Sequence, residues 1–126
     1  MDNRPDLAVI NADNNTVSVF RNTSTTNAIS FASKIDFPTG SLPYSISTGD
    51  LDGDGKSELV IANGNSGSVT VLKNISTTGN ILFDRGRDIG VEETPVFVSV
   101  CDLDGDGKPD LATANYQSKQ LQSTKT

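Results

Sequence analysis

The chain of 126 residues is long enough for one domain with a single core, and its hydrophobic content of 34 % is below that of an average soluble protein. Gly, Asn, Ser, Thr and Asp are frequent between short apolar runs, which is typical of a turn-rich β protein, and we expect neither a membrane span nor a signal peptide at Met1. The net charge is −6, and the absence of a basic stripe together with few, scattered aromatic residues disfavours a nucleic-acid partner, so we expect none.

A repeat runs along the chain. The segment "DLDGDGKSELVIAN" at 50–63 recurs as "DLDGDGKPDLATAN" at 102–115, which is 52 positions later. The same offset, without a gap, places Asp6, Glu58 and Asp110 at one repeat position, so three successive copies are visible. A fixed period of this kind indicates a solenoid or a propeller, in which no single unit can bury its own apolar face.

Four strands are predicted within one period, and they favour the propeller. In chain order they lie at 44–49, 58–63, 68–73 and 80–89. The third alternates Val with Ser or Thr, which is the two-residue period of a strand with one buried face. Because four short antiparallel strands form a propeller blade, the sequence predicts an all-β fold of radially arranged blades. Phe31 and Phe83, which share one repeat position, are expected in the core between blades.

The repeat register divides the chain into about two and a half copies. Their bounds are 1–53, 54–105 and 106–126, within one partial β-propeller that spans residues 1–126. The first copy begins inside the acidic loop and lacks the inner strand that precedes it. Since a closed propeller takes about four to eight blades, we expect either a fragment of a longer protein or a unit that closes the propeller as a homo-oligomer.

The two acidic segments are predicted to bind Ca²⁺. They contain eight of the sixteen acidic residues, and without these the net charge would be +2, so the acidity is local. Aspartates at alternate positions repel one another unless a cation lies between them, and Ca²⁺ takes about six to eight hard oxygen ligands. Gly53, Gly55, Gly105 and Gly107 permit the backbone to wrap around the ion. The expected ligands are the side chains of Asp50, Asp52, Asp54 and Glu58 with the carbonyl of Lys56, and the side chains of Asp102, Asp104, Asp106 and Asp110 with the carbonyl of Lys108.

An EF-hand loop begins in the same way, but the later positions of the two segments exclude it. An EF-hand places a bidentate Glu at the twelfth position and then enters a helix. Here the twelfth residues are Ile61 and Thr113, the acid is at the ninth position, and the next residues are strand-like. In the first copy only Asp2 and Asp6 remain of the loop acids, and no metal is expected there.

The pattern D-x-D-G-D-G-x-x-[DE] followed by "LVIAN" or "LATAN" resembles the FG-GAP or VCBS-type repeat, which occurs in integrin α-subunit propellers and in many secreted bacterial proteins. The resemblance covers the chain to about residue 121. It implies calcium loops between the innermost strand of each blade and the next strand, and a secreted or cell-surface location. The Gly-Ala-Pro element is replaced by the residues at 62–64 and 114–116, and no Phe-Gly element is evident, so the chain is more similar to the bacterial branch. Integrin-like ligand binding is therefore not implied.

No catalytic residue is predicted. Paired carboxylates could serve acid–base chemistry, as in glycoside hydrolysis, but the loop acids are assigned to metal, and Glu92 and Glu93 are adjacent in a connecting segment. The sequence contains no His, which removes the commonest general base and the Ser-His-Asp triad. Cys101 occupies the repeat position of Gly49, and we expect a buried small residue there rather than a reactive thiol.

The sequence therefore predicts a non-catalytic, calcium-stabilised propeller module that binds a protein or a glycan, as in adhesion. Two alternatives remain open. The chain could be the accessory propeller of a secreted hydrolase or lyase whose catalytic residues lie elsewhere. It could also be a sugar-binding lectin, because the propellers that it resembles include lectins with sites between blades.

Overall fold

The computed structural model describes residues 4–92, 94–116 and 121–125, which form strands joined by turns and loops without any helix. Accordingly, no described segment is a helix that could cross a membrane. The all-β fold predicted from the sequence is confirmed. The strands are β1 (Leu7–Asn11), β2 (Thr16–Phe20), β3 (Ile35–Pro38), β4 (Pro43–Gly49), β5 (Glu58–Asn63), β6 (Ser68–Asn74), β7 (Phe83–Gly90), β8 (Pro95–Cys101), β9 (Asp110–Asn115) and β10 (Leu121–Lys125).

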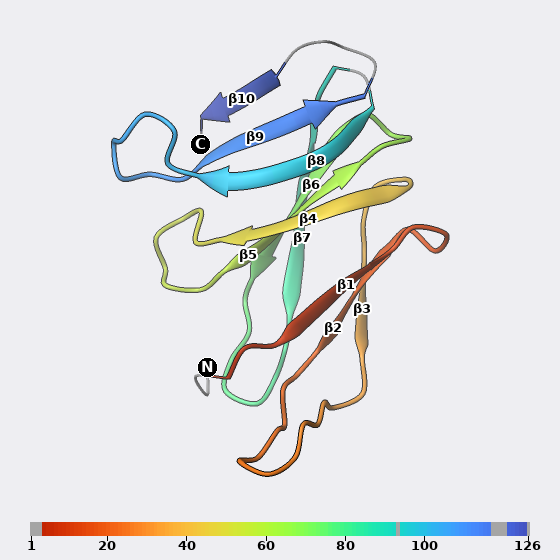
Figure 1. Cartoon of the computed structure of the whole chain (residues 1–126), viewed down its shortest axis with the longest axis vertical. Helices are drawn as coiled ribbons and strands as arrows, with labels where there is room; N and C mark the ends of the chain where they lie inside the picture. The colour runs from red at the N-terminus through yellow and green to blue at the C-terminus, as the bar shows by residue number, and fades with distance from the viewer. Residues whose placement is uncertain (1–3, 93, 117–120, 126) are drawn as a thin grey trace.

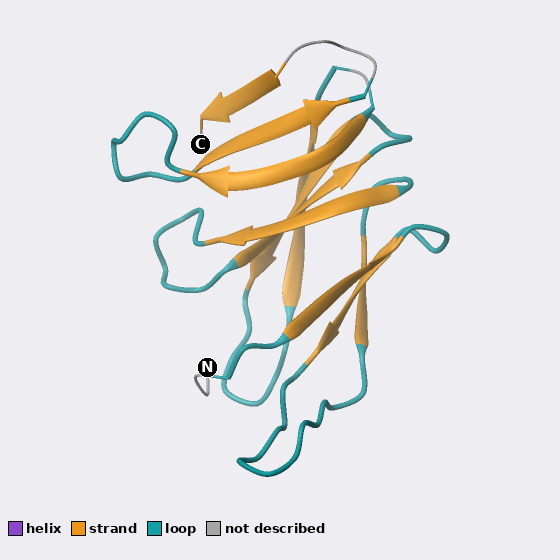
Figure 2. Ribbon diagram, in the orientation of Figure 1, coloured by secondary structure: helices purple, strands orange, loops and turns teal. Residues whose placement is uncertain are grey.

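The strands form three antiparallel sheets that follow one another in the chain (Figures 1 and 2). The first sheet has the order β1-β2-β3, the second β4-β5-β6-β7 and the third β8-β9-β10. Each sheet is a meander in which strands pair in chain order, and the second has the four strands of a complete propeller blade. Figure 1 shows the sheets in sequence order, with the first sheet below and the third above.

Three of the four strands predicted within one period are confirmed within one residue, as β4, β5 and β6. The fourth prediction, 80–89, was wrong at its start, because β7 begins at Phe83. Asn74 and Phe83 are the last pair of the ladder between β6 and β7. Beyond them the N–H of Ile75 donates to the carbonyl of Leu82 at 3.0 Å, and Thr77 and Asn80 form an isolated bridge, so the pairing continues into the loop without forming a strand.

The apolar core lies between the sheets, on both sides of β5. Leu59 and Ile61 join the first sheet's Val17 and Val19 in one buried cluster. Val60, on the opposite face of β5, belongs to a second cluster with residues of the third sheet. Since successive side chains of a strand point to opposite faces, the middle sheet is covered by a neighbour on each face. The apolar residues of β5 are buried because both the first and the third sheet cover them.

The environment of one repeat position depends on the neighbouring sheet. Ile61 in β5 is fully buried, whereas Val9, its counterpart in β1, is 39 % exposed. β1 is an edge strand that pairs with β2, whereas β5 lies between β4 and β6. The first sheet covers the face of β5 that carries Ile61, while Val9 is in neither buried cluster. The difference in burial therefore comes from the covering sheet together with the central position of β5.

The prediction that Phe31 and Phe83 lie in the core is confirmed for Phe83 and wrong for Phe31. Phe83 packs against the first core cluster and meets the ring of Phe37 edge to face, with the centroids 5.2 Å apart. Phe31 is 41 % exposed, so its placement in the core was wrong. It bridges Asn22 in the long β2–β3 connection, outside the sheet. Cys101 is half-buried rather than fully buried.

A polar seam that the sequence patterns did not predict crosses the first two sheets. In the second sheet, the Asn63 amide donates to Thr70 Oγ1 at 2.8 Å, and the Thr70 hydroxyl donates to Asp88. The first sheet repeats this chain at the equivalent positions, from Asn11 through Ser18 to Asp36. The hydrogen bond from Lys34, together with the one from Ser18, holds the pKa of Asp36 below its usual value. The amide and hydroxyl donors of the seam are hydrogen-bonded across neighbouring strands, which lowers the cost of burying them. The buried Oδ1 of Asn63, in contrast, has no hydrogen-bond partner.

The inner strands of the second and third sheets lie against each other. The N–H groups of Val98 and Val100 in β8 donate to the hydroxyls of Ser45 and Ser47 in β4, at 3.3 and 3.1 Å. Edge N–H groups of β8 thus find side-chain acceptors on the preceding sheet. This contact aligns the two strands, and the loop that follows each of them extends at the same edge of the molecule, on the left in Figure 1.

Removing the Ile61 side chain tests whether contact between sheets carries the stability. Ile61→Ala should lower the free energy of unfolding by about 2–5 kcal/mol, because it empties a fully buried site between two sheets. Val9→Ala, at the same repeat position on an exposed face, should cost less than about 1 kcal/mol. Urea denaturation of both variants measures the difference. Equal losses would contradict the assignment of the core to the space between sheets.

Candidate metal centre

Each complete acidic segment forms the loop between the inner strand of a sheet and the next strand. The first connects β4 to β5 and the second connects β8 to β9. Both begin with an aspartate directly after the inner strand and end with an acid that is the first residue of the following strand. The loop position that the family resemblance implies is therefore confirmed.

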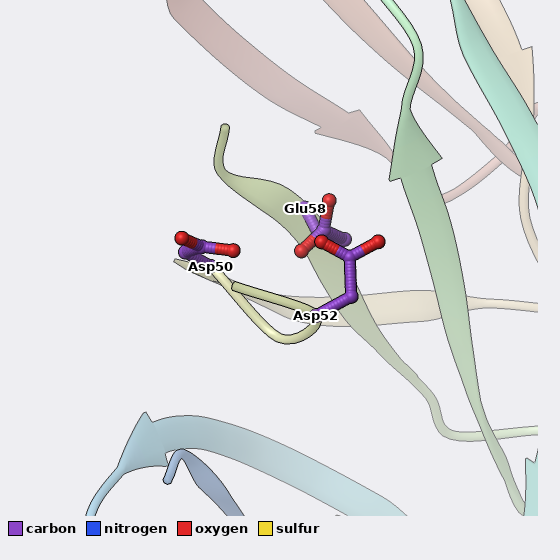
Figure 3. A group of neighbouring side chains, drawn as sticks. All are labelled: Asp50, Asp52 and Glu58. Atoms are coloured by element: carbon purple, nitrogen blue, oxygen red, sulfur yellow. The ribbon is translucent and has the colours of Figure 1, made fainter. Parts of the chain in front are cut away.

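In the first loop, three of the predicted ligands come together. Asp50, Asp52 and Glu58 each offer a carboxylate oxygen, and the three oxygens lie within 4.8 Å of one another. Figure 3 shows that Asp50 and Asp52 come from the loop while Glu58 comes from β5. Carboxylates this close repel one another unless a positive charge or hydrogen-bond donors offset the repulsion.

Glu58 is the buried member of the first group, with 2 % of its surface exposed. One carboxylate oxygen accepts a hydrogen bond from the N–H of Leu51 at 2.7 Å, and the other accepts one from the N–H of Asn74 at 3.4 Å. Burying a carboxylate costs free energy unless it is hydrogen-bonded and its charge is compensated. The two N–H groups supply part of that compensation and fix the carboxylate at the start of β5.

Asp50 shapes the loop itself. Its two oxygens accept hydrogen bonds from the N–H groups of Gly53 and Gly55, both at 2.8 Å, so the backbone wraps around the carboxylate. Both glycines have a positive φ, 79° and 81°, and a Cβ added at either would meet no atom within 4 Å. The backbone conformation, rather than a lack of space, therefore requires glycine at these positions.

The second loop repeats this geometry. Asp102, Asp104 and Asp110 form the equivalent group, and their carboxylate oxygens again lie within 4.8 Å of one another. Asp110 is buried and accepts a hydrogen bond from the N–H of Leu103 at 3.0 Å. The carboxylate of Asp102 accepts from the N–H groups of two glycines with positive φ, as Asp50 does. Two loops 52 residues apart thus have the same acid arrangement.

Two predicted carboxylate ligands lie outside these groups. Asp54 turns toward its own loop, where it accepts a hydrogen bond from the N–H of Lys56 at 2.9 Å, and Asp106 does the same with Lys108 at 2.8 Å. Their role as metal ligands stays a prediction, as does that of the carbonyls of Lys56 and Lys108. In the first copy, Asp2 lies outside the described residues, and Asp6 accepts a hydrogen bond from the N–H of Asn22.

A cation from a neighbouring strand reaches the first group. The Nζ atom of Lys73 in β6 lies 2.6 Å from Oδ2 of Asp52. This hydrogen bond holds the pKa of Asp52 below its usual value, against the opposing effect of desolvation. The carboxylate in turn raises the pKa of Lys73. Sequence reasoning missed Lys73, because it lies outside the acidic motif and reaches the loop only through the register of β6.

Asn74 is a second residue that the motif did not reveal. Its side chain donates to the carbonyl of Ser57 at 3.0 Å, while its backbone N–H donates to Glu58. Asn22 is the counterpart in the first sheet and donates through its backbone N–H to Asp6 at 2.8 Å. Asn74 fastens the end of β6 to the acid that begins β5, and Asn22, just after β2, is bonded to the acid just before β1. The 52-residue spacing of the two Asn residues was the available signal.

The donor set has the chemistry of a site for a hard cation. All the ligand atoms grouped in each loop are carboxylate oxygens, which suit Ca²⁺, Mg²⁺ or Mn²⁺ better than metals that prefer sulfur or imidazole. The buried acid of each group is held by backbone N–H donation, and the other two acids are partly exposed or exposed. These residues fit a divalent cation that reaches the loop from solvent.

The sequence matches the family of FG-GAP-like repeats over residues 1–61 and again over residues 50–113. The chain therefore belongs to this family. Such repeats form propeller-like modules, generally structural rather than catalytic, and they often bind Ca²⁺. The two matched segments end 52 residues apart, in agreement with the internal repeat. A comparison with curated proteins found no match.

A glycine substitution tests the loop conformation. Gly55→Ala should lower the free energy of unfolding in calcium-free buffer by about 1–2 kcal/mol, because it forces an L side chain into a left-handed backbone conformation. Gly90→Ala is the matched control: its Cβ would also meet open space, but Gly90 is not among the residues with positive φ. That variant should lose no stability. If both variants unfold alike, the positive φ is not what requires glycine in the loop.

Proposed function

We propose that the chain is a non-catalytic propeller module whose acidic loops bind Ca²⁺ and that uses its surface to bind a protein or a glycan. One observation carries the metal assignment. In both loops, three carboxylate oxygens lie within 4.8 Å of one another at equivalent repeat positions. A chance cluster of surface acids would not be expected to recur in register with a buried member each time.

Ca²⁺ fits these loops better than Mg²⁺. Ca²⁺ accepts many oxygen ligands in a flexible geometry, whereas Mg²⁺ demands a near-ideal octahedron and keeps most of its water. The glycine-rich loops offer several carboxylates, a donor set that Ca²⁺ accepts without a fixed octahedral geometry. Extracellular calcium sites are commonly weak, with dissociation constants on the order of 10⁻⁴–10⁻³ M. Exposed loops of this kind suit such a site and support the proposed secreted or cell-surface location.

The role proposed for Ca²⁺ is structural. Asp50 and Asp52 belong to the loop and Glu58 to β5, so a cation shared by the three would fasten the end of β4 to the start of β5. Because β5 lies in the centre of the core, order in the loop would stabilise the whole domain. Every carboxylate of the group then serves the cation, and none is left to act as a general acid or base.

A cavity between the first two sheets favours a second candidate, a sugar-binding lectin. The cavity measures about 540 Å³, within the size range of small-ligand sites. Ala8, Ile46 and Leu59 supply apolar lining, and Arg21 and Asn80 lie among the polar lining residues. A mixed lining of this kind could accept a saccharide with one apolar face. A cavity between sheets is also where the lectin alternative places its sites.

Calcium should raise the melting temperature of the chain. At a free Ca²⁺ concentration about 100 times the dissociation constant, binding contributes about 2.7 kcal/mol per site, which corresponds to a rise of several degrees relative to EDTA. Glu58→Gln should reduce this rise by removing the buried charge of the first group. Asp13→Asn, an exposed acid in the β1–β2 turn, should leave it unchanged. Identical melting curves of the unaltered chain in Ca²⁺ and in EDTA would sink the calcium assignment.

Filling the cavity tests sugar binding independently of the calcium-binding loops. Thr48 is exposed in β4 and lines the cavity, so Thr48→Trp should abolish binding on a glycan array by blocking the space. Thr26→Trp adds the same side chain at an exposed position outside the lining and should leave binding unchanged. A glycan signal that survives Thr48→Trp, or no signal for the unaltered chain, would rule out a sugar site in this cavity.

A further inference from the structure

The ion pair between Lys73 and Asp52 connects the candidate metal centre to a strand that carries no part of the acidic motif. Lys73 lies in β6, and Asp52 lies in the loop between β4 and β5. The two charged atoms are 2.6 Å apart, and the side chains are 52 % and 36 % exposed. Solvent therefore reaches the pair, and either group can exchange its partner without a change in the fold.

A cationic residue recurs at this repeat position. Arg21, Lys73 and Lys125 are spaced by 52 residues. Arg21, in the first copy, donates to the carbonyl of Gly79 at 3.1 Å. Lys125 ends β10, and its backbone pairs with Asp110, the buried acid of the second group. In the second and third copies, the cationic residue thus lies on the strand that pairs with the one beginning with the last acid of the loop.

Both oxygens of Asp52 are engaged by the protein. Oδ1 accepts a hydrogen bond from the N–H of Asp54 at 3.2 Å, and Oδ2 is held by Lys73. A divalent cation bound through Oδ2 of Asp52 must share that oxygen with an ammonium group or displace it, and a cation bound through Oδ1 has the ammonium group on the same carboxylate. If Lys73 stays, its charge repels the incoming cation. If Lys73 leaves, its ion pair is lost, so the presence of Lys73 weakens cation binding in either case.

The same contact stabilises the loop without metal. Asp50, Asp52 and Glu58 bring three negative charges together, and Lys73 is the cation shown in contact with this group among the described residues. Its charge offsets part of their repulsion. Lys73 therefore does in the metal-free protein part of what a bound cation would do.

We propose that Lys73 is an internal competitor for the first acidic loop, holding Asp52 in the absence of metal and lowering the affinity of the loop for a divalent cation. This inference rests on the proposed function, since it takes the loop to be a Ca²⁺ site. Its consequence is a higher calcium concentration at half-saturation: Lys73 holds Asp52 when calcium is scarce, and Ca²⁺ takes its place when calcium is abundant.

Calcium titration of a single-site protein tests this competition. Asp104→Asn/Asp106→Asn removes two acids of the second loop and serves as the parent, so that calorimetry reports the first loop. Adding Lys73→Gln should lower the Ca²⁺ dissociation constant by about 3- to 10-fold, as expected for one exposed charge next to the ion. Lys73→Arg, which keeps the charge, should stay within about twofold of the parent.

Lys34→Gln is the matched control. Lys34 forms a similar ion pair with Asp36, at 2.7 Å and with side chains 53 % and 41 % exposed, in a sheet region without an acidic loop. This variant should leave the dissociation constant unchanged. In melting experiments, Lys73→Gln should lower the melting temperature in EDTA and enlarge the rise that Ca²⁺ produces, whereas Lys34→Gln should have the same effect in both buffers.

The outcomes separate this inference from the proposed function. If the parent binds Ca²⁺ and Lys73→Gln binds it no more tightly than Lys34→Gln does, the competition is refuted while the calcium site stands. If neither the parent nor Lys73→Gln binds Ca²⁺ at millimolar concentration, both proposals fail. Binding that appears only in Lys73→Gln would support the competition in its strongest form.

Discussion

The structure depends on the packing of whole sheets against one another, with β5 at the centre. Every residue of β5, from Glu58 to Asn63, is buried, because the first sheet covers one face and the third sheet covers the other. A strand that is apolar on both faces cannot be satisfied by one sheet alone. The repeat is therefore a unit of assembly, and its stability comes from its neighbours.

This packing also builds the candidate metal centre. Glu58 and Asp110 are the first residues of β5 and β9 and share the burial of those strands, while the other acids of each group lie in the loops. Each group is thus fixed partly by the core and partly by a glycine-rich loop. A cation that joins the two parts would connect the loop to strands of the core. It would therefore stabilise the whole domain against unfolding and not only order the loop.

The acid and glycine positions are local properties of the sequence, which is why the repeat, the strands and the three clustered acids of each loop could be predicted. Contacts that depend on tertiary structure could not be predicted in this way. Lys73 and Asn74 reach the loop through the pairing of β6 with β5, and spacing along one segment carries no information on that pairing. Phe31 has the same repeat position as Phe83 but a different environment. Phe31 lies in the β2–β3 connection, outside the sheet, whereas Phe83 begins β7 and packs against the core.

The central claim is that both acidic loops are cation sites built into the packing of the sheets. Equilibrium dialysis of the full chain against millimolar Ca²⁺, with the bound metal measured by elemental analysis, tests it most directly. We expect two Ca²⁺ ions per chain, and one after Glu58→Gln/Asp52→Asn removes two acids of the first group. A chain that retains no Ca²⁺, or a stoichiometry that this double substitution leaves unchanged, would contradict the claim.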